Sequence, residues 1–245
     1  MPITDFTYRS YSQLINTIIE NGYTFSNYHD YAKISNPCIL CHDIDYDIEK
    51  ALKLARIESD IHSISSTYFV MLNTNFYNVF SSSINTMLKK MIKMGHEIGL
   101  HFDEACYTPP ITIMAGYIQK EINLLEQIIE HPVRTISMHR PSQFTLEANI
   151  AITNVVNRYS PVFFKDFKYI SDSRHNWKED IENIVLSKQY KKLHILTHAF
   201  WYTEQNETCK NKLLSFITIA NRKRYDDMSD NFKQLNEFVT LEDIK

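Results

Sequence analysis

The residues best suited to chemistry lie in one short stretch, residues 38–47, with the sequence CILCHDIDYD. An apolar run ends there in a histidine, which is followed by aspartates at alternate positions: Asp43, Asp45 and Asp47. Carboxylates placed so close together repel one another, and a bound cation removes that cost. The pattern indicates a cation site, whereas Asp47 is better suited to cap a helix that begins near Ile48.

Polar residues follow several other apolar segments in the same way. If each segment is a strand of a parallel barrel, these residues share one rim although they are far apart in the sequence. They are His101-Phe102-Asp103, His139-Arg140, Asp172-Ser173-Arg174 and Thr197-His198.

This convergence predicts a catalytic site. Asp45 and His101 offer oxygen and imidazole ligands to a divalent cation, and a water bound to such a cation becomes acidic near neutral pH. Asp43 is expected to act as the general base, and Arg140 to orient it through a bidentate pair that keeps it ionised. His198, on the opposite side, is expected to protonate the leaving group or to steady a developing oxyanion.

Other reactive residue types have more ordinary explanations. Cys38 and Cys41 are three apart on a predicted strand, so they point to opposite faces and do not form half of a zinc site. Trp177 and Trp201 follow rim positions, where they either wall a pocket or pack in the core.

Hydrophobic periodicity alternates along the chain between strand-like and helical segments, about six or seven times, which favours a parallel sheet with crossover helices. The predicted strands are 37–42, 65–72, 96–101, 133–138, 162–170 and 193–196. The predicted helices are 9–22, 47–60, 84–95, 111–130, a polar segment 145–155, a short helix after Trp177 and the chain beyond Asn206.

Composition excludes several classes of protein. A net charge of −3 lacks the excess of positive charge that is typical of nucleic-acid-binding proteins. No apolar run approaches the ~18–20 residues of a transmembrane segment. Four cysteines among 245 residues do not indicate a disulfide framework, and the N-terminus lacks the pattern of a secretory signal. We expect a soluble, cytoplasmic protein.

Taken together, the motifs resemble the polysaccharide deacetylase family, the NodB-homology carbohydrate esterases. Residues 41–45 resemble the family's Thr-Phe-Asp-Asp-Gly motif, and residues 95–101 (GHEIGLH) closely match its Gly-His-Glu-Ile-Gly-Asn-His motif, whose final histidine binds metal. Weaker matches are 66–70 (STYFV), 139–142 (HRPS), 172–177 (DSRHNW) and 196–198 (LTH). The His-Asp-x-Asp form of the first motif is similar to a divergent branch found among surface-polysaccharide biosynthesis proteins.

The resemblance implies a distorted (β/α) barrel of about seven parallel strands in a single deacetylase-like domain, 1–245. Its motif core is 36–202, with an N-terminal helical extension at 1–35 and C-terminal helices at 203–245. The implied activity is metal-dependent, most simply with Zn²⁺, and removes an N-acetyl or other acyl group from a nucleotide- or lipid-linked sugar. The implied setting is the synthesis of an O-antigen (lipopolysaccharide) or capsule precursor.

Two departures from the family pattern bear on the metal. Ile44 stands where the family has its metal-binding aspartate, so that role passes to Asp45. Ala105 stands where a second histidine is expected, which leaves His139, Asp103 or an absent metal as alternatives. We favour His139, because the ends of neighbouring strands come within ligand reach. A hydrolase of a non-sugar C–N bond and a non-catalytic sugar-binding protein are the competing hypotheses.

Overall fold

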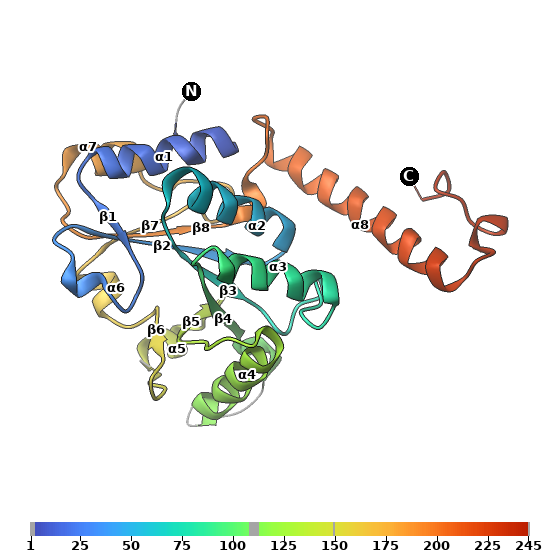
Figure 1. The fold of residues 1–245 in the computed structure, drawn as a ribbon, viewed down its shortest axis with the longest axis horizontal. Helices are drawn as coiled ribbons and strands as arrows, with labels where there is room; N and C mark the ends of the chain where they lie inside the picture. The colour runs from blue at the N-terminus through green and yellow to red at the C-terminus, as the bar shows by residue number, and fades with distance from the viewer. Residues whose placement is uncertain (1–2, 108–112, 149, 245) are drawn as a thin grey trace. The chain divides into compact units, whose positions relative to one another are not determined.

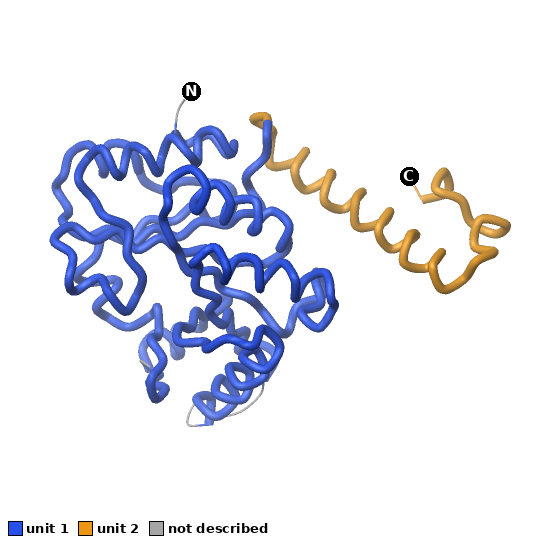
Figure 2. The backbone as a smooth tube through the Cα atoms, viewed as in Figure 1, with its two compact units in different colours: residues 1–204 blue, residues 205–245 orange. Residues whose placement is uncertain are grey.

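A computed structural model describes residues 3–107, 113–148 and 150–244 of the chain. It contains two compact units, Met1–Glu204 and Gln205–Lys245, which Figure 2 shows in different colours. All strands found in the described residues belong to the first unit. The second unit contains α8 (Cys209–Asn231) and a short 3₁₀ turn, Leu235–Glu237. Nowhere in the described residues is a helix long and apolar enough to cross a membrane.

The first unit is built on a curled, entirely parallel sheet with the strand order β6-β5-β4-β3-β2-β8-β7 (Figure 1). An additional short strand, β1 (Thr24–Ser26), pairs with the start of β2. This arrangement confirms the predicted distorted barrel of about seven parallel strands. In order across the sheet the seven are Val156–Asn157, Thr135–His139, Glu97–Asp103, Thr67–Val70, Pro37–Ile44, Leu193–Thr197 and Lys168–Ser171.

Helices α1, α2, α3, α4 and α7 surround this sheet (Figure 1). Asp47 is the N-cap of α2, where its side chain accepts a hydrogen bond from the Lys50 backbone N–H at 3.1 Å, as the sequence predicts. A five-residue π-helical turn, Ile57–Ile61, continues α2. The helices are α1 (Tyr8–Glu20), α2 (Ile48–Arg56), α3 (Ser82–Lys93), α4 (Met114–Ile129), α5 (Gln143–Glu147), α6 (Val162–Lys165) and α7 (Ile181–Ser187).

The predictions fail mainly between residues 143 and 171. The segment predicted as one strand, 162–170, forms α6 followed by β7, because Phe163 and Phe167 both turn into the core. The predicted helix 145–155 is reduced to α5, with the short strand β6 following at Val156–Asn157, and residue 149 lies outside the described residues. Residues 111–112 of another predicted helix lie outside them as well.

The barrel interior is filled by an aromatic cluster. Every residue of β2 is buried, and Ile39 and Cys41 share one face of it with Asp43, because side chains alternate along a strand. The cluster consists of Tyr28, Ile39, Cys41, Phe69, Phe163, Phe167 and Leu196.

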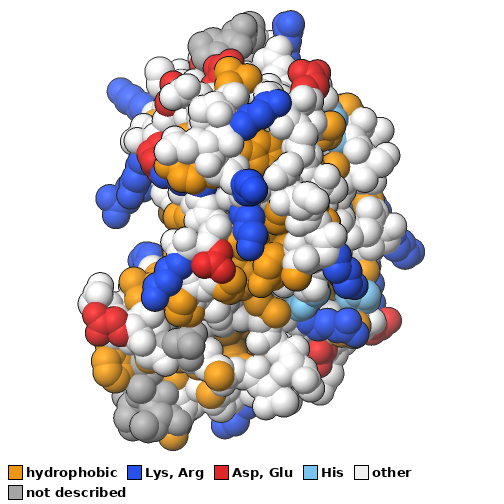
Figure 3. All heavy atoms as spheres, turned by 90° about the vertical axis from the view of Figure 1, so that its left-hand side faces the viewer, with side chains coloured by type: hydrophobic (Ala, Val, Ile, Leu, Met, Phe, Trp, Pro, Cys, Tyr) orange, Lys and Arg blue, Asp and Glu red, His pale blue; other side chains and the backbone are white. Residues whose placement is uncertain are grey.

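Apolar side chains also reach the surface, where Figure 3 shows them gathered in patches among Lys and Arg side chains.

Candidate active site

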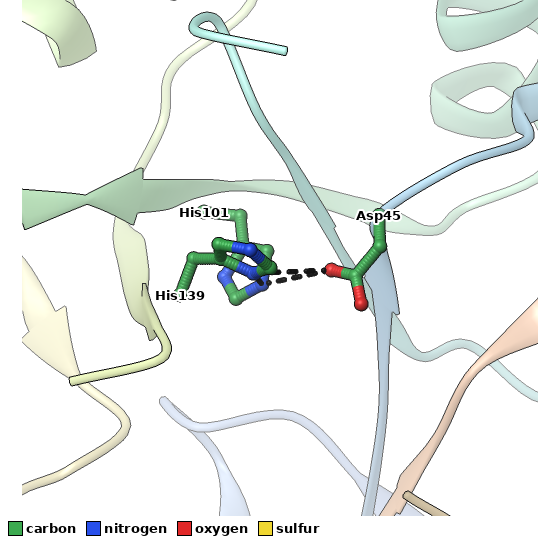
Figure 4. Close-up of side chains that lie close together, drawn as sticks. All are labelled: Asp45, His101 and His139. Atoms are coloured by element: carbon green, nitrogen blue, oxygen red, sulfur yellow. Dashed lines mark hydrogen bonds and ion pairs between the residues drawn. The ribbon is translucent and has the colours of Figure 1, made fainter. Parts of the chain in front are cut away.

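Three potential metal ligands meet at the carboxyl ends of the strands. Asp45 directly follows β2, His101 lies in β4, and His139 is the last residue of β5 (Figure 4). Asp45 Oδ1 is 3.3 Å from His101 Nε2 and 3.3 Å from His139 Nδ1. The two imidazole nitrogens are 3.2 Å apart. Parallel pairing of β4 with β5, which sets Asp103 opposite His139, brings the two histidines to the same edge of the sheet.

These ligand atoms fit a divalent ion. Ligands about 2.1 Å from a tetrahedral ion lie roughly 3.4 Å apart, close to the distances found here. Asp45 Oδ1 is buried and makes ion-pair contacts with the two histidines, but no aligned hydrogen bond within the described part of the chain. His101 Nδ1 is buried and similarly lacks a hydrogen-bond partner there, although metal-binding histidines usually donate from this second nitrogen.

The same contacts favour the charged form of Asp45. Burial raises the pKa of this carboxyl, but the two adjacent imidazoles outweigh burial and hold the pKa below its usual range. Within residues 3–107, 113–148 and 150–244, this is the one group of three or more His, Cys, Asp or Glu side chains arranged to hold a metal ion.

Asp43 lies beside this triad, paired with a buried arginine. Arg158 Nη1 donates to Asp43 Oδ1 at 3.1 Å and to Oδ2 at 3.3 Å, and the Arg158 side chain is only 1% exposed. Burial raises the pKa of Asp43, but Arg158, His101 and His198 together outweigh burial, so that the pKa lies below its usual range. Asp43 Oδ2 also lies 3.7 Å from His101 Nε2, and the Ser137 hydroxyl donates to Asp43 Oδ1 at 3.5 Å. Asp43 is therefore a fixed carboxylate next to the potential metal ligands.

The prediction that Arg140 orients Asp43 is wrong. Arg140 Nη2 instead donates to Asp103 Oδ2 at 3.3 Å, and the Arg140 side chain is 74% exposed. Asp103, the alternative third ligand, accepts hydrogen bonds at both carboxylate oxygens. Arg140 donates to its Oδ2, and the Ala105 backbone N–H donates to its Oδ1 at 3.0 Å. Of the two alternatives, it is His139 whose ligand atom lies with those of Asp45 and His101.

His198 belongs to a second pair, with the fully buried Asp172. Its Nδ1 lies 2.7 Å from Asp172 Oδ1, and its backbone N–H donates to the same oxygen at 3.0 Å. Tyr202 donates its hydroxyl to Asp172 Oδ2 at 3.2 Å. Burial lowers the pKa of His198, but the hydrogen bond to Asp172 and the nearby carboxylates outweigh it and raise the pKa to about 9. His198 is thereby held in a protonated form at neutral pH.

Sequence reasoning missed two residues of this region. Arg158 follows the two-residue strand β6 in a polar segment that carries no motif. Glu58, on the π-helical turn, is fully buried and contacts His42 Nε2 at 2.8 Å, with Tyr11 also bonded to it. His42 consequently faces the helices and not the site, which places it on the opposite side of β2 from Asp43.

No family model matches the chain, and no curated protein matches it. Solved structures similar to it include CE4 proteins, the carbohydrate esterases whose motifs the sequence resembles. One is the Xyl-CE4 domain of a xylanase from the hindgut metagenome of Trinervitermes trinervoides, with 14% identity over 76% of this chain and 83% of that one and a TM-score of 0.45.

Another is the peptidoglycan deacetylase PdaC from Bacillus subtilis, with 11% identity over 84% and 98% of the two chains and a TM-score of 0.43. A third is a CE4 family pseudoenzyme from Bacillus anthracis, with 12% identity over 74% of this chain and 60% of that one and a TM-score of 0.43. The function proposed below therefore rests on the side chains of this chain.

Proposed function

We propose that the protein is a metal-dependent hydrolase that removes an N-acetyl or other acyl group from a sugar. The observation that supports this most strongly is the convergence of Asp45, His101 and His139, whose ligand atoms lie 3.2–3.3 Å apart. One aspartate and two histidines with oxygen and nitrogen donors suit Zn²⁺, which is the ion we propose.

An ion held by these three residues supplies Lewis-acid polarisation of the amide carbonyl and an acidic water. Asp43 is the proposed general base, because its buried carboxylate is ionised and Arg158 fixes its orientation. His198 is the proposed general acid, which donates its proton to the nitrogen of the departing amine. Asp172 holds its imidazole in place, and a pKa of about 9 keeps this proton available at neutral pH.

We further propose that the acylated sugar is a nucleotide- or lipid-linked precursor of an O-antigen or capsule, deacylated before export. This part of the proposal is supported by the His-Asp-x-Asp form of residues 42–45, which resembles surface-polysaccharide biosynthesis members of the family.

The test measures acetate release from N-acetylated sugars, with cyclic amides as competing substrates, by protein purified without an affinity tag and loaded with Zn²⁺. We expect release from the sugars and its loss in Asp45→Ala and His101→Ala. His131→Ala serves as the control, because His131 is an exposed histidine outside the triad. Full activity in the metal-free double variant Asp45→Ala/His101→Ala would overturn the proposal. Sugar binding without acetate release, with several divalent ions supplied in turn, identifies a sugar-binding protein instead.

A further inference from the structure

The second unit, Gln205–Lys245, exposes much of its apolar surface (Figure 2). Among its described residues, Leu235 is the one apolar side chain that is buried. Eight large apolar side chains of this unit are exposed: Leu213, Leu214, Ile217, Ile219, Met228, Phe232, Phe238 and Leu241. So many exposed apolar side chains in so short a segment indicate an interaction surface.

Helix α8 carries a stripe of side chains with the heptad spacing of a coiled coil. Six exposed residues recur at alternating intervals of four and three: Leu213, Ile217, Ala220, Arg224, Asp227 and Asn231. Because each residue advances the helix by roughly 100°, this spacing keeps all six on one side of α8. These six residues are called the α8 stripe below.

The two charges of the α8 stripe determine how it can pair with a second copy. In a parallel pair of helices each residue faces its own copy, so Arg224 would face Arg224 and Asp227 would face Asp227. In an antiparallel pair related by a two-fold axis, residue i faces residue j and j faces i. Arg224 of each copy then faces Asp227 of the other, and the ion pair forms twice.

The same antiparallel alignment brings apolar residues together. It places Leu213 and Ile217, at one end of the α8 stripe, near the C-terminal end of the partner's helix. In that region the exposed rings of Phe232 and Phe238 are stacked, with centroids 5.7 Å apart and an interplanar angle of 23°. The Tyr225 hydroxyl holds the segment after α8 against the helix by donating to a backbone carbonyl at 3.0 Å. Opposite charges therefore meet in the middle of the pair, and apolar side chains meet at both ends.

The charge of the second unit favours a second copy over a lipid surface. Residues 205–245 contain seven Lys or Arg and seven Asp or Glu. Anionic membranes attract segments with an excess of positive charge, which this unit lacks. Equal numbers of both signs, separated along one helix, suit instead a partner with the same sequence in the opposite direction.

We infer that α8 is a dimerisation helix, and that its partner is the α8 stripe of a second copy of this chain in antiparallel orientation. The inference does not depend on the proposed hydrolase activity, because its test measures association alone.

Sedimentation equilibrium of the full chain over a range of concentrations tests the charged pair. We expect the unmodified protein to dimerise. Arg224→Glu and Asp227→Arg should each raise the dissociation constant about tenfold or more, because each places like charges face to face twice. Arg222→Glu is the matched control, since this exposed arginine lies two residues from Arg224 and on the opposite side of the helix.

Mixing the two charge variants separates a loss of pairing from a loss of folding. In a mixed dimer of Arg224→Glu with Asp227→Arg, every facing pair has opposite charges, so an equimolar mixture should dimerise again. The double variant Arg224→Glu/Asp227→Arg should also dimerise, because an antiparallel pair keeps opposite charges together when both are reversed.

Two exposed isoleucines test the apolar part of the α8 stripe. Ile217 and Ile219 are 55% and 52% exposed, but only Ile217 belongs to the stripe. We expect Ile217→Lys to weaken the dimer about tenfold or more and Ile219→Lys to leave it unchanged. Equal weakening by the two variants overturns the inference.

Two other results also overturn it. One is unmodified protein that stays monomeric at every concentration up to millimolar, or charge variants that do not associate when mixed. The other is monomeric protein that sediments with phosphatidylglycerol vesicles, which identifies a lipid surface in place of a second copy.

Discussion

The structure assigns very different consequences to the loss of two arginines, Arg158 and Arg140. Arg158 is 1% exposed and both of its contacts with Asp43 run from Nη1, at 3.1 and 3.3 Å, to a carboxylate that is itself 6% exposed. Arg158→Met keeps most of the aliphatic stem but removes the charge. The uncompensated buried carboxylate then costs about 3–5 kcal/mol of the free energy of unfolding.

Arg140→Met is the matched control. Its guanidinium also contacts one aspartate, Asp103, at 3.3 Å, but its side chain is 74% exposed, and exposed pairs contribute about 0–1 kcal/mol. The sequence motif, in contrast, made Arg140 the partner of Asp43. The two variants therefore distinguish the structure from the motif directly.

Urea unfolding at neutral pH in the presence of a metal chelator measures both free energies. A small domain has about 5–15 kcal/mol in total, so the loss in Arg158→Met is a large shift of the midpoint. Asp43→Asn in the Arg158→Met background should recover part of the loss, because it removes the unpaired charge. Equal stability of Arg158→Met and Arg140→Met, or a larger loss in Arg140→Met, refutes the assignment.

The stability difference between the unmodified protein and Arg158→Met should also depend on pH in a definite direction. In the folded protein Arg158 lowers the pKa of Asp43 from its usual 3.8, so the pair stabilises the protein above that pH and loses its effect as the pH falls further. The difference in stability between the unmodified protein and Arg158→Met should accordingly shrink as the pH is lowered from 5 toward the pKa of folded Asp43. A difference that grows in acid contradicts the mechanism.

Four further predictions concern metal binding, acid stability and packing at two glycines. Zn²⁺ at about 100 times its Kd should raise the free energy of unfolding by about 2.7 kcal/mol, as calorimetry can measure, and His101→Ala should abolish this gain. Burial raises the pKa of Glu58, but His42, His96 and Ser66 together outweigh burial and lower the pKa from 4.5 to about 2. The stabilisation by Glu58 is therefore lost as the pH falls from 4.5 toward 2, and Glu58→Gln should flatten the acid limb of stability against pH. A Cβ on Gly99 would lie 2.7 Å from Phe69 and 2.8 Å from a backbone oxygen. Gly99→Ala should therefore lower the free energy of unfolding by about 1–3 kcal/mol, which urea unfolding measures. Gly116→Ala, with open space in α4, should stabilise by about 0.5–1 kcal/mol.

The sequence predicts the strands that bear the site because these strands are buried on both faces. β2, β3, β4 and β8 appear as short apolar runs, and the polar residues that end each run mark the carboxyl edge of the sheet. Asp45, His101 and His139 can be found in this way, since each lies at or next to such an end. Their common edge then follows from parallel pairing alone.

The region between residues 140 and 171 could not be predicted, because its structure depends on distant partners. β6 has two residues and acquires its strand conformation by pairing with Thr135 and Ile136 of β5, which no local pattern records. Phe163 enters a helix of four residues because its ring packs against Tyr28, at a centroid distance of 4.9 Å. Short elements of this kind are determined by packing and not by periodicity.

Arg140 and Arg158 show how dependence on distant partners affects the prediction of the site. Arg140 adjoins His139 in the sequence, but successive residues at a strand end point in different directions. Arg140 has a left-handed backbone conformation, with a φ of 45°, and its side chain is exposed. Arg158 is 115 residues from Asp43 in the sequence. The pairing of Ile136 with Asn157 nevertheless brings Arg158 into contact with the Asp43 carboxylate. The charge partner of Asp43 thus comes from the residue that follows the edge strand β6. The identity of that partner is therefore a property of the sheet order, which the motif at residues 139–142 does not contain.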